Sequence, residues 1–141
     1  MPDQRPGPNL ARRLGKRTPF ASPEQEAYLN LVRAHAALAA PIDRLLKRHG
    51  ISQPLYNILR ILGGHLRRSG DTGRGLPVLR IRRDMVARVP DMTRLIDRLE
   101  KGGLVERVRC EEDRRIVYVR ITRPGLDLIE RLGPEVDALH R

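Results

Sequence analysis

Residues 91–122 constrain the fold of this chain more than any other stretch, because they have the pattern of one helix followed directly by a β-hairpin. Four apolar residues recur at i, i+3, i+4 and i+7, which places them on one buried face of a helix. They are Met92, Leu95, Ile96 and Leu99. Arg94, Arg98 and Lys101 share a different face of the same helix. The pattern therefore predicts a helix with one apolar and one cationic side.

Two short alternating segments follow this helix. Gly102 and Gly103 are expected to end it, since glycine accepts the positive φ of a helix C-cap. Residues 104–110 and 116–121 then alternate apolar and charged side chains, as half-buried strands do. The polar tip between them is Glu111, Glu112, Asp113, Arg114 and Arg115. Arginine suits a narrow, electronegative minor groove, so the stretch predicts a winged helix that contacts DNA.

The order and spacing of five short pieces resemble the MarR family of bacterial transcription regulators. These pieces are Thr93-Arg94-Leu95, Asp97-Arg98-Leu99-Glu100, Gly103-Leu104-Val105, Asp113-Arg114-Arg115 and Thr122-Arg123-Pro124-Gly125. A looser helical pattern extends the likeness from about Phe20 to the C-terminus. The resemblance implies a mainly α fold with a small β-hairpin (α+β), in which a winged helix-turn-helix is joined to N- and C-terminal helices that form a dimerisation region.

The same resemblance implies the function. It is that of a sequence-specific regulator of transcription that binds double-stranded DNA, a repressor that occupies an inverted-repeat operator as a homodimer and is released by a small-molecule effector. A basic winged helix that binds RNA or another protein is the alternative. Readers of single-stranded RNA use aromatic platforms, and this chain has few aromatic residues, which favours DNA.

The expected organisation is an arm followed by one domain. Residues 1–21 form a basic flexible arm, which is either a contact to phosphates or a partner subunit, or a solvated tail. Within it, Leu10 and Leu14 allow one short helical turn. Residues 22–141 form the MarR-like domain, with a winged helix-turn-helix core at about 52–122 and dimerisation helices at about 22–50 and 122–141.

Capping residues and breakers predict most helix ends. Ser22 and Ser52 are expected to cap the first two helices, and Pro41 is expected to kink or divide the first. In the second helix, the apolar face is Leu55, Ile58, Leu59 and Leu62.

The segment before the helix that follows Asp91 is rich in glycine and proline. Residues 63–75, which contain five glycines, are expected to form a polar loop. A short strand is expected at 76–79, and a helix at 80–89 with Ile81, Met85, Val86 and Val89 turned inward. After the hairpin, Thr122 is expected to cap a helix that Gly133-Pro134 interrupts.

The residues expected to face DNA lie on two elements. They are Asp91, Thr93, Arg94, Asp97, Arg98, Lys101, Asp113, Arg114 and Arg115. Arg94 is the best candidate for a base edge, because a guanidinium makes paired hydrogen bonds to guanine. Thr93 and Lys101 are expected to hold phosphates, and Asp91 to cap the helix. By resemblance, Arg115 enters the minor groove.

Other roles depend on neighbours that the sequence does not fix. By resemblance, Asp113 holds Arg115 in position, and Arg114 meets the DNA backbone or an internal acid. Asp97 and Arg98 either contact DNA or pair with neighbouring charges. Arg107 and Arg109 are either solvated or phosphate contacts.

An effector site is implied by the resemblance alone. In the family, small anionic aromatic effectors bind between the dimer region and the DNA-binding lobe. The candidate residues here are His35, His49, Tyr56 and Arg60.

Composition narrows the remaining function classes. The net charge of +11 attracts polyanions. No glycine-rich phosphate loop, nucleophile motif or metal-ligand spacing occurs, so we expect no enzyme, metal or cofactor. The single cysteine, Cys110, suits a reducing cytoplasm, and no apolar run approaches the ~18 residues of a membrane span. The expected location is therefore the cytoplasm, on the nucleoid when the protein is bound to DNA.

Overall fold

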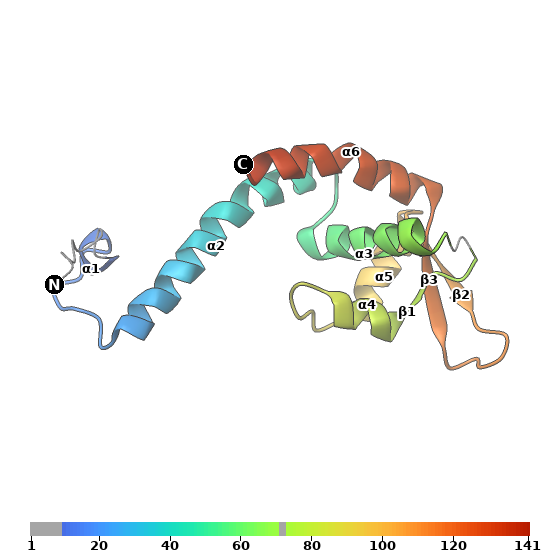
Figure 1. The fold of residues 1–141 in the computed structure, drawn as a ribbon, viewed down its shortest axis with the longest axis horizontal. Helices are drawn as coiled ribbons and strands as arrows, with labels where there is room; N and C mark the ends of the chain where they lie inside the picture. The colour runs from blue at the N-terminus through green and yellow to red at the C-terminus, as the bar shows by residue number, and fades with distance from the viewer. Residues whose placement is uncertain (1–9, 71–72) are drawn as a thin grey trace. The chain divides into compact units, whose positions relative to one another are not determined.

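The computed structural model describes residues 10–70 and 73–141, which are mostly helical with one three-stranded antiparallel sheet (Figure 1). The elements are α1 Leu10–Arg13, α2 Pro23–Arg48, α3 Gln53–Ser69, β1 Leu76–Pro77, α4 Val78–Asp84, α5 Met92–Lys101, β2 Val105–Arg109, β3 Val117–Ile121 and α6 Arg123–Leu139. The predicted mainly α fold with a small β-hairpin is confirmed. The chain divides into two compact units, one ending at Pro41 and one starting at Ile42.

The first unit is organised around the start of α2. Ser22 Oγ accepts a hydrogen bond from the Gln25 backbone N–H at 3.3 Å, so the predicted cap is confirmed. Gln25 Oε1 in turn accepts from the Ala21 N–H at 3.0 Å. The single turn of α1 is tied to α2, because the Leu10 N–H donates to Glu26 Oε1 at 2.9 Å. The part of the predicted arm before Leu10 lies outside the described residues.

Most of α2 in the first unit is exposed to solvent. Every residue from 30 to 38 is exposed, and the exposed set includes large apolar side chains. Those side chains are Leu31, Val32 and Leu38, and Tyr28, three residues before Leu31, is exposed as well. The prediction was that Pro41 kinks or divides the helix; division is wrong, since Pro41 lies inside α2, and the kink stays a prediction. A proline removes one backbone bond only, and the turns on either side keep theirs.

In the second unit, α3 lies at the centre of the core. It contacts α4, α5, α6 and β3. Its predicted apolar face is confirmed: Leu55, Ile58, Leu59 and Leu62 are all buried. Ser52 occupies the N-cap position as predicted, with extended backbone, although its side chain makes no capping hydrogen bond.

The predicted loop at residues 63–75 is wrong for residues 63–69, because α3 continues to Ser69, whereas residues 70 and 73–75 do lie outside helices and strands. Gly63 lies inside this helix and against α6, where an added Cβ would sit 2.4 Å from Ile129 Cδ1. The glycine therefore serves close helix packing, not a turn. The chain leaves α3 at Gly70, which has a left-handed backbone. Residues 71–72 of the predicted loop lie outside the described residues.

The segment before α5 also differs from prediction. The short strand exists, but it is β1, two residues long, paired with β3. Helix α4 starts at Val78 and ends at Asp84, short of the predicted Val89. Ile81 is buried as predicted, whereas Val86 is 90% exposed. Val86 lies in the turn after α4, where its N–H donates to Asn57 Oδ1 at 3.1 Å, so the helical face assumed for it does not exist.

The last helix is longer than predicted. Thr122 caps it, with Oγ1 accepting from the Gly125 N–H at 3.3 Å, as expected. The interruption at Gly133-Pro134 is wrong, because α6 runs without a break to Leu139. Leu132 and Val136 are buried on either side of Pro134, so core packing holds both halves in one helix.

Candidate nucleic-acid interface

Helix α5 begins where the sequence predicted. Asp91 Oδ1 accepts a hydrogen bond from the Arg94 backbone N–H at 3.0 Å and caps the helix. Met92, Ile96 and Leu99 are buried in the core. The opposite side is exposed and carries Thr93, Arg94, Arg98 and Lys101. The helix is thus held by one face and leaves its cations in solvent.

Arg94 and Arg98 line an open hollow beside the start of α5. Leu95 of α5 also lines it, and the rest of its wall comes from the turn before α5 and from the first turn of α3, including Pro54, Val89 and Pro90. The turn and the helix therefore form one surface, on which two guanidinium groups stand one helical turn apart.

Arg107 on β2 joins the wing to α5, and this was not predicted. Its Nη2 donates to Asp97 Oδ1 at 2.5 Å, and its Nη1 pairs with Glu100 Oε2. The Arg107 backbone N–H also donates to Glu100 Oε1 at 3.1 Å. The interpretation of Arg107 as a solvated or phosphate-binding residue is therefore wrong. No periodicity in the sequence indicates this contact, since it depends on how α5 lies against β2.

The opposite charges of Arg107 and of the two carboxylates, Asp97 and Glu100, stabilise one another. Partial burial of Arg107 acts against its charged form, but the hydrogen bonds that it donates to Asp97 and Glu100 outweigh this effect and raise the Arg107 pKa. Both carboxylates of α5 are thereby held toward β2. Asp97, one of the predicted DNA-facing residues, is engaged by Arg107, as the alternative interpretation expected.

The wing is a regular hairpin of β2 and β3. Val105 pairs with Ile121 at one end and Arg109 with Val117 at the other, and the Cys110 N–H extends the ladder to the Ile116 carbonyl at 3.2 Å. Glu106 lies directly opposite Arg120, whose Nε donates to Glu106 Oε1 at 2.6 Å. This pairing raises the Arg120 pKa. In Figure 1 the hairpin extends away from α6, and its tip is the end of the hairpin that lies farthest from that helix.

Asp113 organises the wing tip. Its carboxylate accepts the Arg115 backbone N–H at 2.9 Å, and its carbonyl accepts the Ile116 N–H at 3.0 Å. Such a side-chain to backbone bond fixes a tight turn. The side chains of Arg114 and Arg115 are exposed. The structure thus brings the three predicted tip residues together on one turn.

Further arginines lie on and after α4, and sequence reasoning did not single them out. Arg80 Nε pairs with Asp84 at 2.8 Å and Arg83 Nε with the same carboxylate at 3.3 Å. The Arg80 hydrogen bond is the main cause that lowers the Asp84 pKa. Arg82 and Arg88 are exposed. The signal for them was the local excess of charge, since residues 80–123 contain 13 basic and 8 acidic residues.

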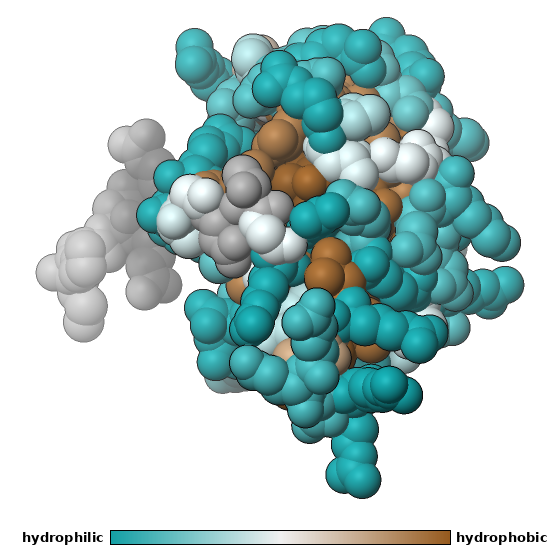
Figure 2. Space-filling view, turned by 90° about the vertical axis from the view of Figure 1, so that its right-hand side faces the viewer, coloured by the Kyte–Doolittle hydropathy of each residue, from teal (hydrophilic) through white to brown (hydrophobic). Residues whose placement is uncertain are grey.

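The face that carries the wing is strongly hydrophilic. Figure 2 shows hydrophilic residues over most of it, with apolar side chains visible only in small areas near the middle. Such a face suits a polar, charged partner better than an apolar one.

Two of the predicted effector residues, Tyr56 and Arg60, lie together on α3. The Arg60 guanidinium lies 5.9 Å from the centre of the Tyr56 ring, and its Nη1 is 3.5 Å from Tyr56 Oη. Tyr56 is buried and Arg60 exposed. His49 is exposed after α2, and His35 belongs to the first unit, where it is exposed. Within residues 10–70 and 73–141, no group of three His, Cys, Asp or Glu side chains is arranged to hold a metal ion.

A model of the MarR family matches residues 74–117. The HTH-type transcriptional regulator FarR of Neisseria gonorrhoeae is 31% identical over 121 residues, which cover 84% of this chain and 76% of that protein. Among solved structures, the MarR transcription factor from Planctomyces limnophilus is 39% identical with a TM-score of 0.69, covering 86% of this chain and 83% of the other.

A second similar structure holds a ligand. It is NadR in complex with 4-hydroxyphenylacetate, with 28% identity, a TM-score of 0.66, and coverage of 87% of this chain and 82% of NadR. In the described part of this chain, no helix is long and apolar enough to cross a membrane.

Proposed function

Because the chain belongs to the MarR family of transcription regulators, we propose that it binds an inverted-repeat operator as a homodimer and represses transcription there. It is a DNA-binding regulator with a winged helix fold. In the proposed complex, α5 lies in the major groove and the wing tip lies in the adjacent minor groove. We place the protein in the cytoplasm, on the nucleoid when bound, and we propose that it acts by binding, not by catalysis.

One observation carries this proposal: α5 keeps its cations exposed while its acids are neutralised. Asp97 and Glu100 are held by Arg107, so they do not oppose an approaching phosphate chain. We assign base recognition to Arg94. We assign phosphate contacts to Thr93, Arg98 and Lys101, all of which are exposed. In this assignment Asp91 and Asp97 act indirectly, one as the helix cap and the other through Arg107.

The wing supplies the second contact. The Asp113 turn fixes the backbone of Arg115, so this guanidinium starts from a defined position. We propose that Arg115 enters the minor groove and that Arg114 meets the phosphates beside it. A stiff hairpin loses little conformational entropy when its tip is bound, which favours this mode of contact.

The uncovered part of α2 supports the homodimer. A helix with every residue from 30 to 38 in solvent gains almost nothing from packing, and packing is what stabilises most protein helices. We propose that a second copy covers Tyr28, Leu31, Val32 and Leu38. Two-fold symmetry would then place two α5 helices about 34–36 Å apart, one turn of DNA, which requires an inverted repeat.

We also propose a small anionic aromatic effector near Tyr56 and Arg60. The guanidinium over the buried ring offers one charge and one stacking surface for such a molecule. The NadR structure with 4-hydroxyphenylacetate supports this class of ligand. His49 and His35 remain the other two candidates from the sequence.

The test is a selection from sheared genomic DNA with purified full-length protein, followed by sequencing and footprinting. We expect an inverted repeat with half-sites one helical turn apart. Arg115→Ala should weaken protection at AT-rich flanks, and the matched Arg109→Ala should leave them protected. Preference for RNA over duplex DNA, or enrichment of sequences without a repeat, would contradict the proposal.

A further inference from the structure

The wing tip carries more acidic than basic residues, although the proposed function brings it against DNA. Its three acids and two arginines are Glu111, Glu112, Asp113, Arg114 and Arg115. Asp113 is engaged in the turn, since it accepts the Arg115 backbone N–H at 2.9 Å. The Glu112 side chain is 80% exposed. A carboxylate in this place repels phosphates, so a further cation from outside the hairpin would favour binding of the tip to DNA.

Arg74, in the segment before β1, supplies such a cation. Its Nη2 lies 3.9 Å from Glu112 Oε1. Its guanidinium carbon lies 5.9 Å from the centre of the Tyr118 ring on β3. An arginine interacts favourably with the face of an aromatic ring as well as with a carboxylate. The Arg74 side chain is therefore held beside the hairpin by two different contacts, one of which reaches the tip.

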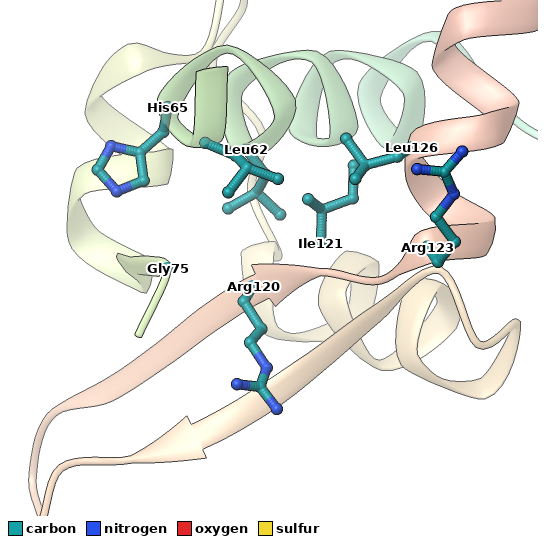
Figure 3. A pocket seen from close by; sticks show the side chains of 8 residues that line it. Leu62, His65, Gly75, Arg120, Ile121, Arg123 and Leu126 are labelled. Carbon is teal, nitrogen blue, oxygen red and sulfur yellow. The ribbon is translucent and has the colours of Figure 1, made fainter. Parts of the chain in front are cut away.

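The backbone on both sides of Arg74 is fixed to β3. On one side, the Gly73 carbonyl accepts a hydrogen bond from Arg120 Nη1 at 3.0 Å. On the other side, Gly75 has a φ of +79° and lies so close to β3 that an added Cβ would sit 2.1 Å from the Val119 carbonyl oxygen. Gly75 and Arg120 also line a small pocket, shown in Figure 3, where the Arg120 side chain is directed along the hairpin. Arg74 therefore starts from a defined position beside the wing.

We propose that Arg74 is a positioning residue for the wing: it neutralises Glu112, so that Arg114 and Arg115 meet the DNA without an opposing carboxylate. This inference rests on the proposed function, in which the wing tip lies in the minor groove. Arg74 has for the tip the role that Arg107 has for the two acids of α5. Each wing contact to DNA then depends on a cation that itself binds protein.

The ion pair acts on DNA binding and not on folding. An exposed pair of this kind contributes little to the free energy of unfolding, because water and salt screen it. Its effect on DNA binding depends on whether residue 112 is charged. A direct contact from Arg74 to a phosphate, in contrast, would act whether or not Glu112 is present. This difference separates the two roles by experiment.

A double-mutant cycle on the full-length protein tests the proposal, with affinity measured for the operator recovered in the genomic selection. Arg74→Gln should weaken binding by about fivefold, because Glu112 then faces phosphates unpaired. In a Glu112→Gln background, the same substitution should change affinity by less than about twofold. An equal loss in the two backgrounds would overturn the proposal, because Arg74 would then act independently of Glu112.

Glu111→Gln provides the matched control, because it removes the same charge from the adjacent exposed position. In this background Arg74→Gln should still weaken operator binding by about fivefold, since the pair with Glu112 is intact before the substitution. If the effect of Arg74→Gln disappeared in the Glu111→Gln background as well, the total charge of the tip would explain it, and the specific pair would be rejected.

Footprinting and thermal unfolding give two further readouts for Arg74→Gln. Protection should decrease at the AT-rich flanks and persist at the half-sites, and the unfolding temperature should match that of the wild type. A loss confined to the half-sites, or a lower unfolding temperature that Glu112→Gln does not restore, would overturn the role given to Arg74. A wild type that binds no DNA would reject the proposed function, whereas DNA binding without coupling between Arg74 and Glu112 would reject this inference alone.

Discussion

At the scale of single residues, Arg107 neutralises two carboxylates of α5, the helix proposed to contact DNA. It holds two carboxylates of α5 and also donates to the Thr93 carbonyl at 3.5 Å, so one side chain touches three positions of the helix. A charge cluster of this kind both orients α5 and removes negative charge from its outer side. Its role is therefore positional, and its effect on DNA is expressed through α5.

Replacing Arg107 with Met should weaken operator binding by about tenfold or more, because Asp97 then loses its cation and Glu100 keeps only the backbone N–H of residue 107, which leaves their negative charge near the proposed DNA uncompensated. Stability should fall by about 1 kcal/mol, since Arg107 is only partly buried. Electrophoretic mobility shift and thermal unfolding measure the two effects. The control is Arg109→Met, which removes the same charge from an exposed position on β2. Equal stability loss in the two variants would contradict the role given to Arg107.

Arg94 and Lys101 are expected to make different kinds of contact with DNA, although both are exposed cations of α5. Arg94→Ala should reduce discrimination between operator and random DNA by about 1–3 kcal/mol, because it loses a base contact. Lys101→Ala should weaken both DNAs about equally and reduce the slope of affinity against salt by about 1. Titrations at several salt concentrations distinguish them, and the reverse pattern would show that the roles are exchanged.

At the scale of elements, the close packing of α3 against α6 stabilises the winged helix. Gly63 allows this contact, since an added Cβ would meet Ile129 at 2.4 Å. The neighbouring Gly64 has more room, with the nearest atom for its Cβ being the flexible end of Arg68 at 3.3 Å. The two glycines stand side by side in one helix and differ only in what they face.

Gly63→Ala should therefore destabilise the protein by about 1–3 kcal/mol through overpacking. Gly64→Ala should be neutral or stabilising by up to about 1 kcal/mol, because alanine is the better helix former. Chemical denaturation followed by circular dichroism measures both. A stabilising Gly63→Ala would mean that α3 and α6 can separate at no cost, which the packing here does not allow.

At the scale of the whole molecule, the decisive feature is the apolar surface that α2 leaves in solvent. Leu31 is 70% exposed and Leu38 62% exposed, both on a helix whose neighbouring residues are exposed as well. In the homodimer proposed above, a second copy covers this surface, and the two-fold symmetry of such a dimer sets the symmetry of the DNA site.

Leu31→Glu should convert the proposed dimer into monomers, because a buried unpaired carboxylate at a two-fold interface occurs twice. Sedimentation velocity should show half the mass, and affinity for the inverted repeat should fall by at least about tenfold while a half-site is bound as before. Asn30→Glu introduces the same charge without removing apolar surface and should remain dimeric. A wild type that sediments as a monomer would reject the dimer.

The sequence by itself determined the elements whose causes are local. The start of α5 at Asp91, the cap at Thr122, and the alternation that forms β2 and β3 all depend on residues within a few positions of one another. The exposed cations of α5 and of the wing tip follow from the same patterns. This is why the predicted positions of the recognition helix and the wing agree with the structure.

Only the tertiary structure decided features whose causes lie far apart in the chain. Gly63 and Pro134 are predicted to break helices, yet both lie inside helices, because the packing of α3 and α6 outweighs the low helix propensity of these residues. Arg107 reads as a solvated strand residue, yet it joins β2 to α5. Local rules fix which segments are helices and strands, whereas the contacts between segments choose the partners of each side chain, and those partners leave α5 cationic.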